Sequence, residues 1–339
     1  MTSGSAGTTT SRIICLGVWA DYAEFFWKRA DPDRFDLSVV QVHQEARRHP
    51  LYQFAPSFAR GLLHTLAIRR CFRDNSEALF VVNEVPRILK FLLDMPFPRK
   101  VAVVMRNPMA SKPKLHSTLN ALHSHGTRIL SFDPQDCSRY GFEHYRQYLE
   151  PLPGLHDIPI QHDFGFYGAD KGRRPFLEKL SAELKDRGFS TRLHFPGDSR
   201  QTTRRWFGRK PRKARNSPYA SYLAETLAAR CLIDILQPGQ NGLTLRPLEA
   251  LFYGRKLLTN NRAIAEEPFF HPANIFIVDG AASLDGLERF MAAPMADIDP
   301  AITALYGVNR LLQQLTNPSA GAETTAIAPA RFAKRRVKS

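Results

Sequence analysis

Two glycine-containing segments of the sequence carry residues suited to a phosphorylated ligand. In residues 168–173 (GADKGR), Gly168 lets the backbone approach a phosphate, and the cationic heads of Lys171 and Arg173 suit a pyrophosphate. The segment follows an expected strand and precedes an expected helix, whose free amides add to the attraction. A tight turn with solvated basic side chains would look the same, so this motif is weak by itself.

The second segment is residues 237–251 (QPGQNGLTLRPLEAL), which follows an apolar run and opens an expected helix. Flexible glycines and free amides at the start of a helix can bind a diphosphate. Glu249, one to two turns into the helix, could accept hydrogen bonds from a ribose. The alternative is an ordinary loop with Glu249 as a helix-surface carboxylate, but the length and glycine content favour binding. The backbone groups expected to contact the ligand belong to Asn241, Gly242, Leu243 and Thr244.

Short apolar runs alternate with helical periodicity along the chain. Strands are expected at residues 12–18, 37–42, 78–82, 100–105, 128–132, 163–167, 190–195, 231–236, 256–259 and 274–278. Strands that alternate with helices predict parallel sheets covered on both faces, with right-handed crossovers. The expected fold class is therefore α/β, with two Rossmann-like domains that face each other across a cleft at the strand ends.

The length of 339 residues suits two domains, and residues 151–161 (PLPGLHDIPIQ) form the best linker because they combine three prolines with a glycine. A helix is expected at residues 301–315. The expected organisation is a disordered N-terminal tail (1–11), a first domain (12–150), the linker, a second domain (162–318) with a basic insertion (199–215), and a basic disordered tail (319–339).

A family resemblance is carried by residues 131–142 (SFDPQDCSRYGF), 166–173 (FYGADKGR) and 234–261 (DILQPGQNGLTLRPLEALFYGRKLLTNN). The last of these resembles the nucleotide-sugar-binding segment of GT-B glycosyltransferases, in which Glu249 matches the second of two glutamates. Asn241 stands where the first glutamate normally is, and Lys171 resembles the lysine that contacts the donor phosphates. More closely, residues 12–315 resemble bacterial lipopolysaccharide-core and capsule biosynthesis proteins.

The resemblance implies a glycosyltransferase that moves a sugar from a nucleotide-sugar donor, bound by the second domain, to a cell-envelope glycan or glycolipid presented by the first. No metal or cofactor is expected, because basic residues and helix dipoles would offset the charge on the departing diphosphate. Asn241 can hydrogen-bond sugar hydroxyls but cannot stabilise cationic charge as a carboxylate would.

Asp21 and Arg106 are the candidate residues of the first domain. Asp21 follows the first expected strand and is the candidate base, because the acceptor hydroxyl must lose a proton. Its alternative role is a helix N-cap. Arg106, at the end of a strand, could hold an anionic acceptor or equally pair with a surface carboxylate.

Two other functions remain open from the sequence. A non-catalytic nucleotide-sugar or glycan-binding protein on the same fold is supported by Asn241. A nucleic-acid-binding protein is less favoured, because charge alone supports it and no nucleic-acid module is recognised.

The net charge of +15 is concentrated in two segments, residues 199–215 with eight basic side chains and residues 331–338 with five. The first also contains Trp206 and Phe207, so it suits an anionic membrane surface, an acceptor phosphate or stacked bases. A solvated loop is a serious alternative.

The four cysteines lie far apart without a CxxC pair, and no run of 18 apolar residues occurs. They are expected as buried free thiols in a reducing compartment. The expected location is cytoplasmic, with peripheral association at the inner membrane. Three histidines, His116, His123 and His125, invite a metal interpretation, but no acidic residue has suitable spacing.

Overall fold

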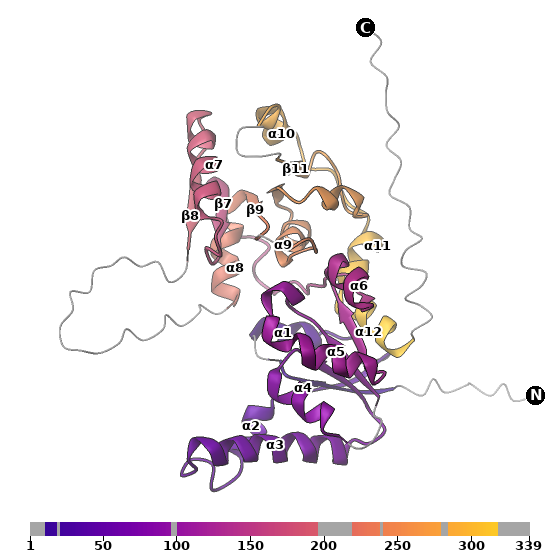
Figure 1. The fold of residues 1–339 in the computed structure, drawn as a ribbon. Coiled ribbons are helices and arrows are strands. Elements are labelled where there is room, and N and C mark those ends of the chain that lie inside the picture. Colours follow the sequence, from indigo (N-terminus) through magenta and orange to yellow (C-terminus); the bar gives the residue numbers. More distant parts are fainter. Residues whose placement is uncertain are drawn as a thin grey trace, which may run out of the picture. The chain divides into compact units, whose positions relative to one another are not determined.

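The computed structural model describes residues 11–18, 21–95, 100–195, 219–237, 240–278 and 284–317. The described chain divides into two units, residues 11–150 with 307–317 and residues 151–306 (Figure 1). Each unit is built on a parallel sheet with helices around it. The predicted fold class of two Rossmann-like α/β domains is therefore confirmed.

The sheet of the first unit has the strand order β2-β1-β3-β4-β5-β6, and all of its pairs are parallel. Most residues of the central strands are buried and apolar, as expected for strands covered on both faces. The strands are β1 (Arg12–Leu16), β2 (Asp36–Val40), β3 (Leu79–Asn83), β4 (Val101–Val104), β5 (Arg128–Ser131) and β6 (Glu143–His144).

The helices of the first unit pack their apolar faces on this sheet. Phe72 of α3 stacks on Phe80 of β3 with ring centroids 3.9 Å apart, and Ile68, Leu89 and Leu119 join the same core. The helices in this part of the chain are α1 (Asp21–Trp27), α2 (Val42–Arg47), α3 (Ser57–Asp74), α4 (Pro86–Leu93), α5 (His116–Ser124) and α6 (Pro134–Tyr140), with 3-10 turns at Met109–Ser111 and Pro113–Leu115.

The last described helix, α12 (Val308–Thr316), also belongs to the first unit. Its first amide, on Val308, donates to Glu150 Oε1 at 2.7 Å. At its other end Arg128 donates to the carbonyls of Leu315 and Gln314 at 2.9 and 3.2 Å. These contacts satisfy groups that a helix leaves unpaired at its ends. The assignment of residues 162–318 to one domain is thus corrected from Gly307 on.

The predicted helix over residues 301–315 is also corrected. The structure has α11 (Pro300–Thr303), a 3-10 turn (Ala304–Tyr306) and then α12, because Gly307 adopts an extended backbone with φ −90° and ψ 162°. The chain changes unit at this glycine.

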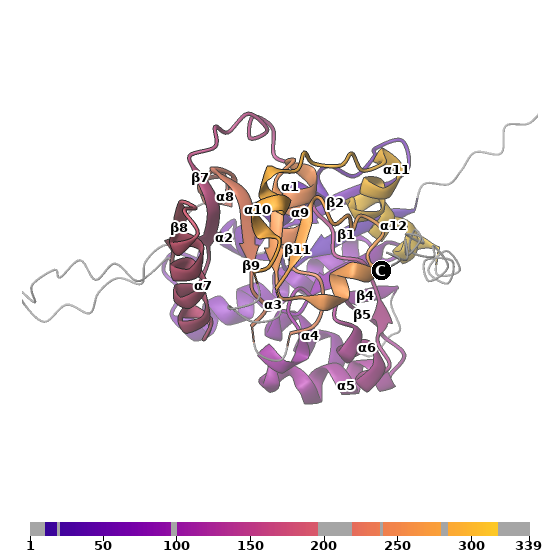
Figure 2. The same cartoon turned by 90° about the horizontal axis from the view of Figure 1, so that it is seen from above.

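The sheet of the second unit has the order β11-β10-β9-β7-β8, again all parallel. Gly165 of β7 is required where β7 meets β9, because a Cβ there would lie 2.6 Å from Cβ of Ala229. Helix α7 lies against β8 at the edge of the unit (Figure 2). The strands are β7 (His162–Tyr167), β8 (Thr191–His194), β9 (Ala229–Asp234), β10 (Lys256–Thr259) and β11 (Ile275–Ile277). The helices are α7 (Arg174–Asp186), α8 (Tyr219–Leu227), α9 (Leu245–Phe252), α10 (Leu287–Ala292) and α11, with a 3-10 turn at Arg262–Glu266.

Both sheets reverse their strand order at one place. In the first unit the chain goes from β1 to the outer strand β2 and returns to β3 on the other side of β1. In the second unit β7, β8 and β9 repeat this path. Such a switch point leaves a crevice at the carboxyl ends of the two strands, where ligands bind in open α/β sheets.

The basic segments 199–215 and 331–338 and both expected tails, apart from Ser11, lie outside the described residues. Across the ranges described above, none of the helices combines the length and the apolar composition that a membrane span requires.

Candidate functional site

The two predicted phosphate-binding segments meet at the switch point of the second unit. Residues 168–173 follow β7 directly, and residues 237–251 include the loop after β9 and most of α9. Because β7 and β9 are neighbouring parallel strands, both loops leave the same edge of the sheet. The structure therefore brings together two segments that lie about 70 residues apart in the sequence.

A pair of arginines clasps these loops to each other. Arg173, which follows β7, donates from Nη1 to the carbonyl of Ile235 after β9 at 2.8 Å. Arg246, which follows β9, donates from Nη2 to the carbonyl of Tyr167 at the end of β7 at 2.6 Å. Each arginine thus bonds to the loop of the other strand, which fixes the relative positions of the two loops.

The first loop has a strained backbone at Lys171. Lys171 has φ +47° and Gly172 has φ +81°, and Lys171 is the non-glycine residue with positive φ in the described part of the chain. This conformation costs a side-chain-bearing residue about 1–2 kcal/mol. Strain of this kind concentrates at functional sites. Both residues are exposed, so the loop presents the Lys171 cation at the surface.

Arg173 shapes this loop from within. Its Nη2 donates to the carbonyl of Ala169 at 2.6 Å and its Nε donates to that of Asp170 at 3.2 Å, in addition to its bond to Ile235. The Asp170 carboxylate in turn accepts from the backbone amide of Arg174 at 2.9 Å, at the start of α7. The predicted contact of Arg173 with a pyrophosphate stays a prediction, because its guanidinium already serves three carbonyls.

The second loop leads into a buried ion pair at the start of α9. Arg246 is 7% exposed, and its Nε lies 3.0 Å from Oε2 of Glu249, which is 1% exposed. Tyr219 of α8 donates to the other oxygen of Glu249 at 2.9 Å, and Arg246 also donates to the hydroxyl of Tyr222. The alternative of a helix-surface role for Glu249 is wrong. Its predicted hydrogen bond to a ribose stays a prediction, because both carboxylate oxygens face partners of the same unit.

Asp234, at the end of β9, adds a second buried carboxylate. Its Oδ1 accepts from the Thr244 hydroxyl at 3.1 Å. Within the residues that the structure describes, Asp234 Oδ2 and Arg246 Nη1 are buried and have no hydrogen-bond partner. Buried polar groups are almost always paired, so each of these two atoms would accept a water molecule or a ligand group as its partner.

Burial shifts the pKa of the two carboxyl groups in this network. Desolvation raises the pKa of both Asp234 and Glu249, and the positive charge of Arg246 acts against that shift in each case. Charge buried without such compensation would cost several kcal/mol. Arg246 and the half-buried Arg173 thus act with two buried carboxyl groups, and Lys171 adds a positive charge at the exposed surface.

The remaining predicted residues of the second unit lie before α9 and after β7. Asn241 is exposed, Gly242 and Leu243 are buried, and Thr244 occupies the N-cap position with an extended backbone. Gly168 follows β7 and is half-buried. The predicted use of the helix-start amides stays a prediction.

Sequence reasoning missed four residues of the network: Asp234, Arg246, Tyr219 and Tyr222. The i,i+3 spacing of Arg246 and Glu249 at a helix start was the available signal, since such pairs lie on one helix face.

The predicted residues of the first unit lie at the carboxyl ends of its strands. The side chain of Arg106 donates to Gln147 Oε1 at 3.0 Å, and its guanidinium carbon lies 4.7 Å from the ring centroid of Tyr148. Its backbone amide donates to Glu84 at 2.9 Å. Asp21 is the first residue of α1, and its side chain lies outside the described part. The acceptor and base roles of these residues stay predictions.

A cavity of about 380 Å³ lies where β1 and β2 end, lined among others by Gly17, Gln41, His43, His64 and Val85. Its polar groups form a cluster around His64. His43 Nδ1 and the Tyr52 hydroxyl each lie 3.2 Å from His64 Nε2, and Arg87 Nη1 lies 2.7 Å from His64 Nδ1. Arginine can only donate, so His64 Nδ1 accepts and the imidazole is neutral with its proton on Nε2. Burial, together with the charge of Arg87, lowers the pKa of His64, in agreement with this assignment.

In the described ranges, no group of three or more His, Cys, Asp or Glu side chains is arranged to hold a metal ion. His116, one of the three histidines considered for a metal, instead donates from Nε2 to the carbonyl of Met109 at 2.8 Å.

Comparison with known proteins gives structural neighbours only. No family model matches the chain, and no curated protein sequence matches it. Among solved structures, the glycosyltransferase SnogD from Streptomyces nogalater shares 16% identity over 94% of this chain and 100% of its own, with a TM-score of 0.41.

Two further neighbours are similar in kind. The glycotransferase of kitacinnamycin shares 11% identity over 93% of this chain and 98% of its own, with a TM-score of 0.41. The spinosyn rhamnosyltransferase SpnG shares 14% identity over 94% of this chain and 97% of its own, with a TM-score of 0.36. At these identities and scores, the function has to be argued from the residues.

Proposed function

We propose that the chain is a glycosyltransferase that binds a nucleotide-sugar at the switch point of its second unit. The observation that supports this most is the reciprocal clasp of Arg173 and Arg246, which fixes the two predicted phosphate-binding loops at adjacent strand ends. Loops at this place in open α/β sheets hold nucleotides, and backbone amides at a helix start attract phosphate.

In the proposed complex, the diphosphate lies between the exposed Lys171 and the start of α9. Lys171 and the amides of residues 241–244 would offset the negative charge that grows on the diphosphate as the sugar leaves. Arg246 would act from inside the unit, where it pairs with Glu249 and donates to the hydroxyl of Tyr222. Asn241, on the exposed side of the loop, would hydrogen-bond the sugar.

The first unit would bind the acceptor. The cavity beside His43 and His64 offers imidazole groups and the Arg87 guanidinium among apolar side chains, and these groups would hydrogen-bond sugar hydroxyls. Asp21 remains the proposed base. The resemblance described above favours a cell-envelope glycan as the acceptor, and we include that class in the proposal.

A non-catalytic binder of the same ligands is the second candidate. It is supported by Asn241, since this loop carries an amide where the resembling enzymes carry a carboxylate. Release or transfer of the donor sugar would distinguish the enzyme from the non-catalytic binder.

The test is to incubate the full chain with radiolabelled UDP-, GDP-, ADP-, CMP- and dTDP-sugars, with and without envelope glycan, and to follow sugar release and transfer. Transfer or slow hydrolysis of one donor, lost in Lys171→Ala, supports a glycosyltransferase. Binding of a donor without any turnover supports the non-catalytic binder, and no binding by the folded chain excludes both.

A further inference from the structure

The first unit exposes an apolar surface far larger than isolated side chains would give. Of seven large hydrophobic residues exposed in the described part of the chain, five fall between residues 51 and 66. They are 54 to 78% exposed and comprise Leu51, Phe54, Phe58, Leu62 and Leu66. Clusters of this kind mark interaction sites. We call these five residues, together with Arg69 and Arg73, the α3 surface.

The spacing along α3 places most of this surface on one side of the helix. Phe58, Leu62 and Leu66 follow one another at intervals of four, so they lie on one face. Arg69 and Arg73 continue the same face toward the C-terminal end of the helix, and both are exposed. The face therefore passes from apolar to cationic along its length.

The charge around the surface is mostly positive. Residues 46–73 contain six arginines and no aspartate or glutamate. Across a groove of about 960 Å³ between α3 and α4, Arg87 and Lys90 add two more cations, and Asp94 is the acidic residue that lines it. A surface with this charge is complementary to a layer of anions.

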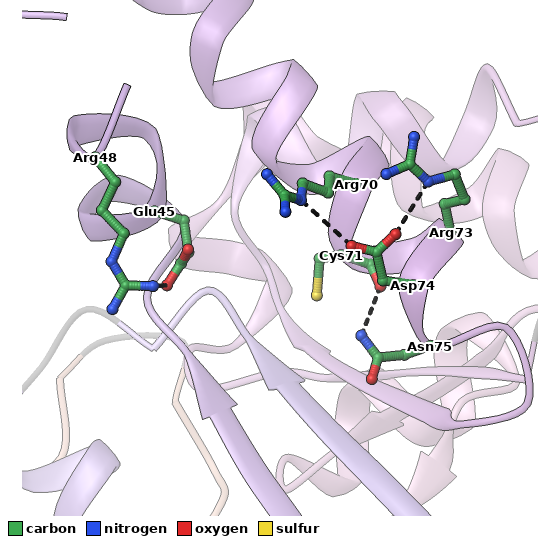
Figure 3. A network of polar contacts seen from close by, with 7 residues as sticks. All are labelled: Glu45, Arg48, Arg70, Cys71, Arg73, Asp74 and Asn75. Carbon is green, nitrogen blue, oxygen red and sulfur yellow. Dashed lines mark hydrogen bonds and ion pairs between the residues drawn. The ribbon is translucent and has the colours of Figure 1, made fainter. Parts of the chain in front are cut away.

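The carboxylates at the margins only partly offset this charge. Arg70 and Arg73 share Asp74, with Nε to oxygen distances of 3.3 and 3.0 Å, and Arg48 pairs with Glu45 at 2.6 Å (Figure 3). In Figure 3, Asp74 receives both arginines at the last turn of α3. Three arginines thus share two carboxylates, and the excess stays positive.

We propose that the α3 surface docks on an anionic lipid bilayer, with α3 in the plane of the interface. The Phe and Leu side chains would enter the boundary between headgroups and acyl chains, and the arginines would meet lipid phosphates. A protein partner fits less well, because an arginine-rich border beside long protruding apolar side chains matches a uniform anionic layer. This docking does not depend on the proposed donor site.

The experiment is cosedimentation of the full chain with vesicles of phosphatidylcholine alone and of phosphatidylcholine with 30% phosphatidylglycerol. Three variants are compared with the wild type: Phe58→Ser/Leu62→Ser, Arg69→Gln/Arg73→Gln, and Ile160→Ser. Ile160 is the matched control, because it is a large exposed hydrophobic residue (54%) of the other unit. Circular dichroism and thermal unfolding check that each variant is folded.

We expect the wild type and Ile160→Ser to bind the anionic vesicles equally. Phe58→Ser/Leu62→Ser should lose about tenfold in binding per side chain, from the apolar area withdrawn from the bilayer. Arg69→Gln/Arg73→Gln should lose binding to the anionic vesicles and show a weaker dependence on salt. Binding of a nucleoside diphosphate, measured on the same samples, should be unchanged.

Two outcomes would overturn the proposal. One is equal vesicle binding by the wild type and Phe58→Ser/Leu62→Ser, which would assign any membrane affinity to other segments. The other is no vesicle binding by the wild type, together with light scattering that shows a dimer in the wild type and a monomer in Phe58→Ser/Leu62→Ser. In that case the surface is covered by a second copy of the chain.

Discussion

The two sheets reverse their strand order in the same way, yet the residues behind the two switch points differ in kind. Behind β7 and β9, Arg246, Glu249 and Asp234 are buried, and two of their polar atoms have no partner in the described ranges. Beyond the carboxyl ends of β1, β2 and β3, His43 and His64 are half-buried beside a cavity. One site contains buried charged groups, whereas the other contains a neutral histidine that is bonded to the exposed Arg87.

This difference teaches that topology fixes where a ligand binds and that side chains decide which ligand. Buried charge is expensive, and a buried ion pair is often no more stable than an apolar replacement. Under the proposed function, the charged groups of the second unit would serve an anionic ligand. The neutral histidine of the first unit needs no such ligand, and its cavity suits hydroxyl groups.

The largest effect is expected from Glu249→Ala. Removal of this carboxylate leaves Arg246 buried without its partner, which should lower the free energy of unfolding by about 3–5 kcal/mol. Urea unfolding measures it. Glu225→Ala is the control, because Glu225 pairs with Arg192 on the surface at 3.5 Å and should change stability by less than about 1 kcal/mol. Equal losses of unfolding free energy in the two variants would mean that the buried ion pair contributes no more to stability than the surface pair.

Lys171→Gly should separate binding from stability. Glycine adopts positive φ without strain, so the free energy of unfolding should stay the same or rise by about 1 kcal/mol. The lost cation should weaken nucleoside diphosphate binding by about tenfold, measured by calorimetry. Lys179→Gly, on the exposed face of α7, should lower stability by about 1 kcal/mol and leave affinity unchanged. Unchanged affinity of Lys171→Gly for the nucleoside diphosphate would show that Lys171 does not contact this ligand.

The smallest effect is expected at the first switch point and depends on pH. The pKa of His64 is lowered in the folded chain from its ordinary value of 6.5, so the unfolded chain takes up a proton first as the pH falls. His64 should therefore reduce stability below about pH 6.5 and have no such effect at pH 8.

Thermal unfolding from pH 8 to pH 5 measures this, with His64→Gln showing a shallower decline than the wild type. His125→Gln is the control, because His125 is exposed at the end of α5. A wild-type decline that His64→Gln reproduces in full would show that His64 is not the neutral group inferred from its bond to Arg87.

Much of the fold followed from the sequence because strands and helices leave local patterns. The strand predicted at residues 256–259 has those bounds in β10, and the other nine expected strands differ by one or two residues at their ends. The short helices α2 and α6 were missed because they lack a repeating apolar face. For α6, Asp133 as an N-cap and Pro134 as the first helical residue were unused signals.

Two features that the sequence could not predict, the helix break at Gly307 and the arginine bonds between the loops, depend on contacts between distant residues. The break at Gly307 depends on Glu150, which accepts from Val308 across 158 residues. The loops of the proposed donor site were predicted from glycines and charges, but the bond from Arg246 to the Tyr167 carbonyl spans 79 residues. No local pattern records such a pairing, so the arginine clasp required the structure.

The most direct test of the central claim is titration calorimetry of the full chain with UDP, GDP, ADP, CDP and dTDP, for the wild type and Arg246→Lys. Lysine keeps the charge but loses the fork that reaches the Tyr167 carbonyl, Tyr222 and Glu249 together. We expect the wild type to bind one nucleoside diphosphate and Arg246→Lys, folded by circular dichroism, to bind it at least tenfold more weakly. Failure of the folded wild type to bind any of the five, or equal affinity in both proteins, would contradict a donor site at this switch point.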